Sequence, residues 1–145
     1  MRTAPSRGPR TEVTLAGNTP PAAEIAAALR AAGVADVADS VLQRALYSSD
    51  ASLYRVVPRV VAWPHDAAEV EAALAVCRAW QVPLTCRGAG TSIAGNAIGT
   101  GVVLDFSRHM REVTEIDAGA RLAVVQPGVV QAQLQRAAAP YDAPR

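Results

Sequence analysis

A glycine-rich segment between two short apolar runs restricts the possible folds of this chain more than any other feature. Five of the ten glycines lie between residues 88 and 101. The segment follows the strand-like residues 82–86 and precedes the apolar run 102–104. Glycine adopts positive φ without steric cost and lets another group approach its backbone, so successive N–H groups can converge on an anion. The segment therefore predicts a phosphate-binding loop between two short apolar strands.

A strand–helix–strand order leads into this loop. Residues 60–63 form an apolar run between two prolines, which is typical of a buried strand. Asp66 and Glu69 have the spacing of a helix-capping pair, and an apolar stripe at helical spacing follows them. The stripe consists of Val70, Ala73, Leu74 and Cys77. A helix that connects two strands in this way predicts an α/β layer with a right-handed crossover.

The flanking segments complete the predicted organisation. Residues 1–20 lack apolar periodicity and are predicted to form a mobile arm, whereas residues 21–58 are predicted to form a helical lead-in. The helices of the lead-in are expected over residues 22–32 and 37–47. Two strands joined by a turn and then a last helix are expected further on, at residues 111–116, 121–125 and 129–139. Residues 59–145 are thus predicted to form a small parallel or mixed sheet with flanking helices, an α/β or α+β fold.

Composition excludes several classes of function. The formal net charge is +1, which is not the balance of a nucleic-acid-binding protein, and 4% aromatic residues are too few for a base-stacking surface. No apolar run reaches the roughly 18 residues of a membrane span, and the N-terminus has no apolar signal segment. The two cysteines, Cys77 and Cys86, lack the spacing of a metal site and favour a reduced, cytoplasmic protein.

Two well-known phosphate loops do not fit the segment. A Walker loop requires a lysine, and all 14 basic residues are arginines. The dinucleotide fingerprint G-x-G-x-x-G fails because Ile93 stands where the third glycine is required. Arg87 could contact an anion directly or brace the loop. Polar side chains that could add hydrogen-bond donors are Thr91, Ser92 and Asn96. A long turn without a ligand stays open as the alternative.

The order of several motifs along the chain resembles one family. The motifs are VVAWP, VPLT, RGAGTSIAG, GVVLD, EID and VQPGV, at residues 60–64, 82–85, 87–95, 101–105, 115–117 and 125–129. Together they resemble the N-terminal half of the FAD-binding domain of the vanillyl-alcohol oxidase and p-cresol methylhydroxylase type. The similarity is greatest to FAD-linked oxidases of the D-lactate dehydrogenase and glycolate oxidase kind, some of which carry an iron–sulfur domain.

This resemblance implies non-covalent FAD, bound by the loop and by a later proline–glycine turn. The implied cofactor-binding residues are Arg87, Gly88, Ala89, Gly90, Thr91, Ser92, Gly95, Asn96, Pro127 and Gly128. Thr91 stands where relatives with covalent flavin often have a histidine, so no covalent link is expected. The implied activity of the intact protein is the oxidation of a 2-hydroxy acid such as lactate or glycolate, with the chemistry supplied by the flavin.

The resemblance also implies that part of the site is missing. The family continues with further cofactor-binding motifs and a substrate domain, whereas Asp142 stands where the next glycine is expected. We therefore expect an incomplete FAD site, with no catalytic residue and no metal ligand, completed by a missing C-terminal half or a partner subunit. His65 and His109 are interpreted as surface histidines. Two alternatives remain: a truncated, non-enzymatic remnant that does not bind cofactor alone, and a general anion-binding module for another nucleotide.

Overall fold

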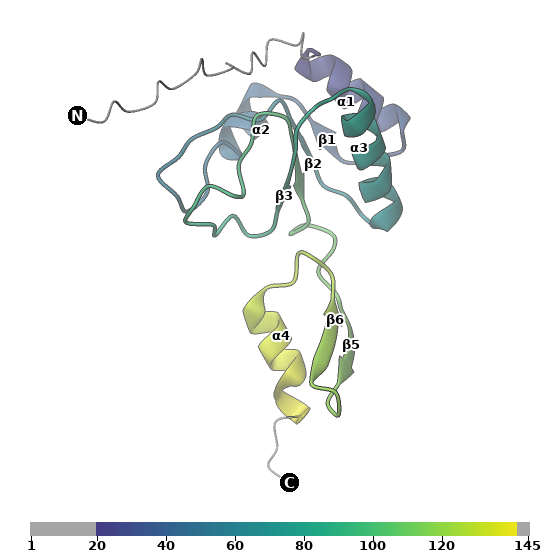
Figure 1. Cartoon of the computed structure of the whole chain (residues 1–145), viewed down its shortest axis with the longest axis vertical. Coiled ribbons are helices and arrows are strands. Elements are labelled where there is room, and N and C mark those ends of the chain that lie inside the picture. The colour runs from purple at the N-terminus through teal and green to yellow at the C-terminus, as the bar shows by residue number, and fades with distance from the viewer. Residues whose placement is uncertain (1–19, 142–145) are drawn as a thin grey trace, which may run out of the picture.

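The computed structural model describes residues 20–141, so the predicted arm lies outside the described residues except for Pro20. The elements in chain order are α1 (Ala22–Ala31), β1 (Val37–Ala38), α2 (Val41–Leu46), β2 (Val60–Ala62), α3 (Ala67–Ala79), β3 (Leu84–Arg87), β4 (Val102–Asp105), β5 (Val113–Asp117), β6 (Leu122–Val125) and α4 (Gln131–Ala138), with a final 3₁₀ turn (Ala139–Tyr141). Figure 1 shows α1, α2 and α3 gathered around β1, β2 and β3, while β5, β6 and α4 lie together apart from them.

The first four strands form one mixed sheet in the order β1-β2-β4-β3. Strand β4 pairs in parallel with β2 on one side and with β3 on the other, and β1 pairs antiparallel with β2. The predicted strand–helix–strand order is confirmed by β2, α3 and β3. Because β4 lies between β2 and β3, the glycine-rich loop carries the chain from the edge strand back to the centre of the sheet.

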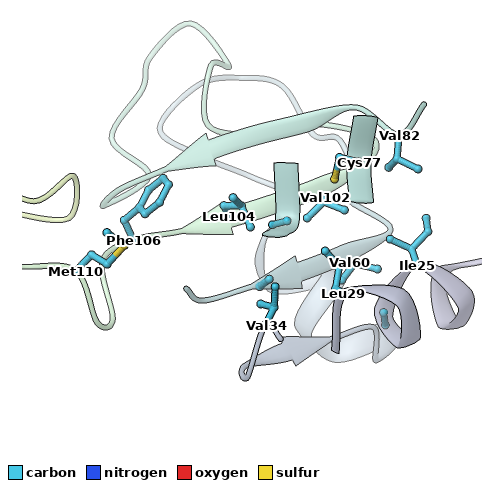
Figure 2. Packing of buried hydrophobic residues seen from close by; sticks show 13 residues of the cluster. Ile25, Leu29, Val34, Val60, Cys77, Val82, Val102, Leu104, Phe106 and Met110 are labelled. Atoms are coloured by element: carbon cyan, nitrogen blue, oxygen red, sulfur yellow. The ribbon is translucent and has the colours of Figure 1, made fainter. Parts of the chain in front are cut away.

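The centre of this sheet is buried because helices cover it. Every residue of β2 and β4 is buried. Helix α1 contributes Ile25 and Leu29 to the core, and α3 contributes Ala73 and Cys77, as Figure 2 shows for Ile25, Leu29 and Cys77. The lead-in helix therefore shares one hydrophobic core with the strands that follow residue 59, and a domain boundary between residues 58 and 59 stays a prediction.

Helix α3 begins as the capping pair predicted. The Asp66 carboxylate accepts a hydrogen bond from the Glu69 N–H at 2.9 Å, which satisfies one of the free donors of the first turn. Of the predicted stripe, Ala73 and Cys77 are buried, whereas Leu74 is half exposed. Leu74 lies on the wall of a shallow groove between α3 and β3, which Cys77, Val82 and other residues also line.

The helix predicted over residues 37–47 is wrong in its first part. Val37 and Ala38 form β1, because they pair with Ala62 and Val61 and so extend the sheet. The helix begins only at Val41, after Ser40 accepts a hydrogen bond from the Gln43 N–H at 3.3 Å. A two-residue strand has no detectable periodicity, so sheet pairing decides a conformation that the local pattern does not show.

Strands β5 and β6 form the predicted hairpin as a separate two-stranded sheet. The Asp117 carboxylate accepts a hydrogen bond from the Ala120 N–H at 2.9 Å, and Arg121 closes the turn with a φ of 56°. No residue of β6 or α4 is buried. We refer to β5, β6 and α4 as the hairpin unit, and to β1–β4 with α1–α3 as the layer. Among residues 20–141, no helix is long and apolar enough to cross a membrane.

Candidate functional site

The glycine-rich loop leaves the sheet at the carboxyl end of β3. In open α/β sheets this edge is where ligands bind. Gly90 and Gly95 have φ values of +68° and +81°, which favour glycine because a side chain is strained there. A methyl group on Gly90 would also contact the Arg87 guanidinium, and one on Gly95 would lie 2.9 Å from the Tyr54 ring. The backbone of the loop thus depends on glycine at both positions.

The first part of the loop keeps its backbone donors free. Within residues 20–141, none of the five backbone N–H groups from Gly88 to Ser92 donates a hydrogen bond. The next part is closed on itself, because the Ser92 hydroxyl accepts from the N–H groups of Ala94 at 3.3 Å and Asn96 at 3.0 Å. The loop therefore offers a run of unused donors on a backbone with small side chains, next to a segment that fixes its shape.

Arg87 holds the loop in place through contacts with both the loop and the segment before β2. Its Nη1 donates to the carbonyl oxygens of Ser49 at 2.9 Å and Ala97 at 3.4 Å. Its guanidinium carbon lies 5.0 Å from the centre of the Tyr47 ring, within the range of a cation–π contact. Of the two roles that the sequence left open for Arg87, these contacts are those of a brace, and they join both ends of the loop to the segment before β2.

A second brace comes from Asp50, to which the sequence assigned no role. Its carboxylate accepts from the Ala97 N–H at 3.3 Å and from the Ser52 N–H at 2.9 Å, and the hydrogen bonds from Ser52 hold the pKa of Asp50 below its ordinary value. The neighbouring Ala51 N–H donates to the Gly90 carbonyl at 3.1 Å. The available signal was the irregular, polar stretch itself, because such segments are usually held by bonds between side chains and backbone.

The predicted proline–glycine turn lies beside the start of the loop. A Cβ added to Gly88 would meet the Pro127 carbonyl oxygen at 3.8 Å. Gly128 is buried, and a Cβ there would collide with the carbonyl oxygens of Phe106 and Met110. Its N–H donates to the Met110 carbonyl at 2.9 Å. The structure therefore brings Pro127 and Gly128, which are distant in sequence from the loop, to the same place.

Three side chains, the half-buried Tyr47 and the buried Trp63 and Asp105, form a hydrogen-bonded group in the layer. The Tyr47 hydroxyl donates to Asp105 Oδ2 at 2.5 Å and accepts from Trp63 Nε1 at 2.8 Å. Burial and the bond to Asp105 raise the pKa of Tyr47. Asp105 also accepts from the Ser107 N–H at 2.7 Å. These hydrogen bonds connect the end of α2, the residue after β2 and the last residue of β4. They hold the start of the turn whose Phe106 and Met110 carbonyl groups contact Gly128.

The two histidines, interpreted from the sequence as surface residues, lie together. Their rings stack with centroids 3.7 Å apart, and both Nε2 atoms face Asp36 Oδ2, His65 at 3.3 Å and His109 at 2.8 Å. His65 is exposed, whereas His109 has 25% of its side chain exposed and is half-buried. The hydrogen bond with His109 is the main cause that holds the pKa of Asp36 below its ordinary value. We call these three residues the His–Asp cluster.

A glycine-rich loop at the carboxyl ends of the parallel strands of a mixed sheet, with amides that donate to no group within residues 20–141, defines an α/β domain of the phosphate- and nucleotide-binding class. Residues 58–143 match the family described as FAD binding domain. This chain therefore belongs to the FAD-binding domain family, as the order of its motifs predicted, and FAD is the cofactor that defines that family.

Curated relatives at 36–38% identity include two kinds of enzyme. Over 101 residues the chain is 38% identical to D-2-hydroxyglutarate dehydrogenase of Pseudomonas putida, and this match covers 68% of this chain and 10% of that protein. Over 112 residues it is 36% identical to the glycolate oxidase subunit GlcD of Bacillus subtilis, which covers 75% of this chain and 24% of that protein. The chain thus spans a tenth to a quarter of the length of these relatives.

Solved structures show the same fold. An alkyldihydroxyacetonephosphate synthase superposes with a TM-score of 0.68 at 22% identity, over 81% of this chain and 25% of that chain. The p-cresol methylhydroxylase structure with substrate bound gives a TM-score of 0.63 at 18% identity, over 81% of this chain and 24% of that chain. The predicted fold class, a small mixed sheet with flanking helices of the p-cresol methylhydroxylase type, is confirmed.

Proposed function

We propose that this chain supplies the diphosphate-binding part of the FAD site in a flavin-dependent oxidoreductase that oxidises a 2-hydroxy acid such as lactate or glycolate. The observation that carries the proposal is the run of five backbone N–H groups from Gly88 to Ser92 that donate no hydrogen bond to any group of the described part of the chain, residues 20–141. The relatives of the chain support the substrate class, since they include a D-2-hydroxyglutarate dehydrogenase and a glycolate oxidase subunit.

The residues present fit a diphosphate. Two phosphoryl groups require several donors, and backbone amides supply them when no bulky side chain blocks the approach. Gly88, Ala89 and Gly90 provide such a backbone, and Pro127 limits the space on the far side of Gly88. Thr91, Ser92 and Asn96 add polar side chains, and Arg87 keeps the loop in place. Gly95 contributes through its positive φ, and Gly128 through the close approach of the Phe106 and Met110 carbonyl oxygens, which leaves no room for a side chain.

The part of this chain in the reaction is binding and orientation. When bound, FAD supplies the two-electron oxidation of the substrate carbon that carries the hydroxyl group. The loop holds the negative charge of the diphosphate without a lysine, and the braces from Arg87 and Asp50 remove the freedom that the glycines would otherwise give it. With Thr91 in place of a histidine, the chain holds its cofactor without a covalent bond.

Other residues must complete the site, from a C-terminal part or from a partner subunit. The hairpin unit supports this proposal, because Leu122 is 66% exposed and Val124 is 55% exposed on a sheet of only two strands. An exposed apolar face of this kind is typical of a surface that another part of a protein covers. Both cysteines are free thiols, which agrees with the reducing cytoplasm as the expected compartment.

The test uses two glycine substitutions of the same kind. Gly90→Ala adds a methyl group to a left-handed residue of the loop, against the Arg87 guanidinium, whereas Gly33→Ala adds one to a left-handed residue at the end of α1 with nothing within 4 Å. We expect Gly90→Ala to weaken FAD binding about tenfold and Gly33→Ala to leave it unchanged. Binding is measured as bound flavin absorbance and fluorescence, with the chain alone and after addition of the remaining part of the domain.

The outcomes separate the competing functions. FAD binding that appears or strengthens when the remaining part is added supports a divided site. No binding by the reconstituted pair rejects the FAD assignment and favours a non-enzymatic remnant. Binding of ADP with the same affinity as FAD, and without any change in flavin fluorescence, favours a general anion-binding module.

A further inference from the structure

The His–Asp cluster is assembled from three segments that sheet pairing brings to one edge. Asp36 directly precedes β1, His65 follows β2, and His109 lies in the turn after β4. Because Val37 pairs with Ala62 and β2 runs parallel to β4, the start of β1 and the ends of β2 and β4 are neighbours. One ligand atom from each of the three side chains lies within 4.8 Å of the others.

The backbone around the cluster is held firmly. The Trp63 N–H donates to the Asp36 carbonyl at 2.9 Å, which fixes the chain before His65 to the chain that carries the carboxylate. Pro64 is buried. The Met110 N–H donates to the Phe106 carbonyl at 3.1 Å, which closes the turn that carries His109. The three side chains are therefore positioned by parts of the layer that pack independently of the cluster.

The cluster has the chemistry of a transition-metal site. Two imidazole nitrogens and one carboxylate oxygen suit Zn²⁺, Ni²⁺, Co²⁺ and Cu²⁺, whereas Mg²⁺ and Ca²⁺ prefer oxygen ligands only. We propose that Asp36, His65 and His109 bind one divalent transition-metal ion, with its remaining coordination positions taken by water. Their side chains are 25–45% exposed, which leaves room for the ion and its water ligands to enter.

The distances agree with this assignment. Ligands about 2.0–2.1 Å from a tetrahedral Zn²⁺ lie roughly 3.3 Å from one another. His65 Nε2 already has this separation from Asp36 Oδ2, and His109 Nε2, at 2.8 Å, must move out by roughly 0.5 Å to reach it. Both rings must also tilt out of their stacked arrangement so that their lone pairs meet at one point. Glu69, whose carboxylate accepts from the His65 N–H at 3.3 Å, adds negative charge beside the site.

A metal ion bound to the His–Asp cluster would connect three segments: the α1–β1 connection, the residues after β2 and the turn after β4. That turn carries the carbonyl groups of Phe106 and Met110 that enclose Gly128. An ion that binds the folded chain and not the unfolded chain raises the free energy of unfolding. Well above the Kd, this gain grows with the logarithm of the ratio of the free ion concentration to the Kd. The site is therefore a structural one that stabilises the edge of the layer from which the hairpin unit departs.

The experiment is zinc titration by calorimetry of the full chain, made without a polyhistidine tag and stripped with a chelator. It is done in a Cys86→Ser background, because Cys86 is an exposed thiol that could bind zinc by itself. We expect one Zn²⁺ per chain, a rise in Tm with zinc, and no competition from Mg²⁺. His65→Asn, His109→Asn and Asp36→Asn should each weaken binding about tenfold or more, whereas Asp39→Asn, a neighbouring carboxylate outside the cluster, should not.

A second measurement does not depend on the folding of a cluster variant. In the Cys86→Ser chain with Asp36, His65 and His109 all in place, Co²⁺ should give visible ligand-field bands without a thiolate charge-transfer band, and Zn²⁺ should shift the ring resonances of both histidines. Zinc affinity that is equal in the parent and in both histidine variants would overturn the proposal. Histidine resonances that stay unchanged at saturating zinc would do the same, and would leave the cluster as two imidazoles hydrogen-bonded to one carboxylate.

Discussion

The layer and the hairpin unit are built from similar residues but differ in what they bury. Every residue of β2 and β4 is buried, whereas no residue of β6 is. A backbone bond from the Gly128 N–H to the Met110 carbonyl ties the hairpin unit to the turn after β4, whereas the bond from the Gln126 N–H to the Glu112 carbonyl lies within the hairpin itself. An isolated two-stranded sheet is only marginally stable in water. The layer therefore supplies its own stability, and the hairpin unit depends on contacts from elsewhere.

This difference matters for the candidate site, because the loop belongs to the layer, whereas Pro127 belongs to the connection between β6 and α4 within the hairpin unit. The loop is held by Arg87 and Asp50, which contact it through bonds that the layer makes by itself. Pro127 stays beside Gly88 only while the connection keeps its path. One side of the site is therefore fixed, and the other is as stable as the attachment of the hairpin unit.

The largest expected effect comes from the same substitution in the two regions. Leu104→Ala opens a cavity in the core of the layer and should lower the free energy of unfolding by about 2–5 kcal/mol. Leu122→Ala removes an exposed side chain of the hairpin unit and should change the free energy of unfolding by less than about 0.5 kcal/mol. Urea unfolding followed by tryptophan fluorescence measures both, since Trp63 and Trp80 lie in the layer. Equal losses would mean that the two regions share one core.

A smaller effect is expected at the junction. Gly128→Ala places a methyl group against the carbonyl oxygens of Phe106 and Met110 and should cost about 1–3 kcal/mol of local stability. Amide hydrogen exchange should become faster in β5 and β6 and stay unchanged in β2 and β4. Gly119→Ala, in the exposed turn between β5 and β6, is the control. Faster exchange throughout the layer would show that the junction supports both regions.

The hydrogen bonds of Tyr47 to Asp105 and Trp63 in the layer should show a pH-dependent effect. Tyr47→Phe leaves Asp105 and Trp63 without their partner and should cost roughly 1–2 kcal/mol near neutral pH. Because the pKa of Tyr47 is raised in the folded state, its contribution is complete below the pKa of the unfolded chain and is lost as pH rises through the folded pKa. Unfolding at several values from pH 8 to 11 should show the parent losing stability relative to Tyr47→Phe. A constant difference would mean that Tyr47 titrates normally.

The smallest effect on the free energy of unfolding is expected from substitution of Cys86. The two cysteines are therefore compared by their rates of chemical labelling. Burial raises the pKa of the Cys77 thiol to about 11, whereas Cys86 is exposed. A thiol-specific dye at pH 8 should therefore label Cys86 rapidly and Cys77 only when the layer opens. Cys86→Ser should change stability by less than about 0.5 kcal/mol and abolish the rapid phase. Two rapid labelling events would show that α3 does not stay packed on the sheet.

The sequence predicted best those elements whose signals are local. Helix α3 carries its own capping pair at Asp66 and Glu69, and β4 is an unbroken apolar run, so both were found at nearly their observed limits. Strand β1 was missed because two residues carry no period, and their conformation is decided by pairing with Val61 and Ala62. The position of the glycine-rich loop was likewise predicted, because the glycines and the apolar runs around it lie within one short stretch.

What holds the candidate site could not be predicted, because its contacts join residues that are far apart in the chain. Arg87 bonds to Ser49 and Asp50 bonds to Ala97, at separations of 38 and 47 residues. Asp36 and His109 are separated by 73 residues. No local pattern reports such pairs, so two histidines that look unrelated in the sequence become neighbours only when the sheet forms.

The bracing of the loop by the segment before β2 has a consequence for how the chain acquires its shape. The glycines do not set their own conformation, and the bonds that hold the two ends of the loop, unlike the local bonds of Ser92, come from residues 38 and 47 positions away in the chain. Contacts over such separations form late and slowly during folding, since a long stretch must first be closed. The loop is thus expected to be among the last parts to become ordered, and under the proposed function substitutions near residue 50 would weaken FAD binding without contacting FAD.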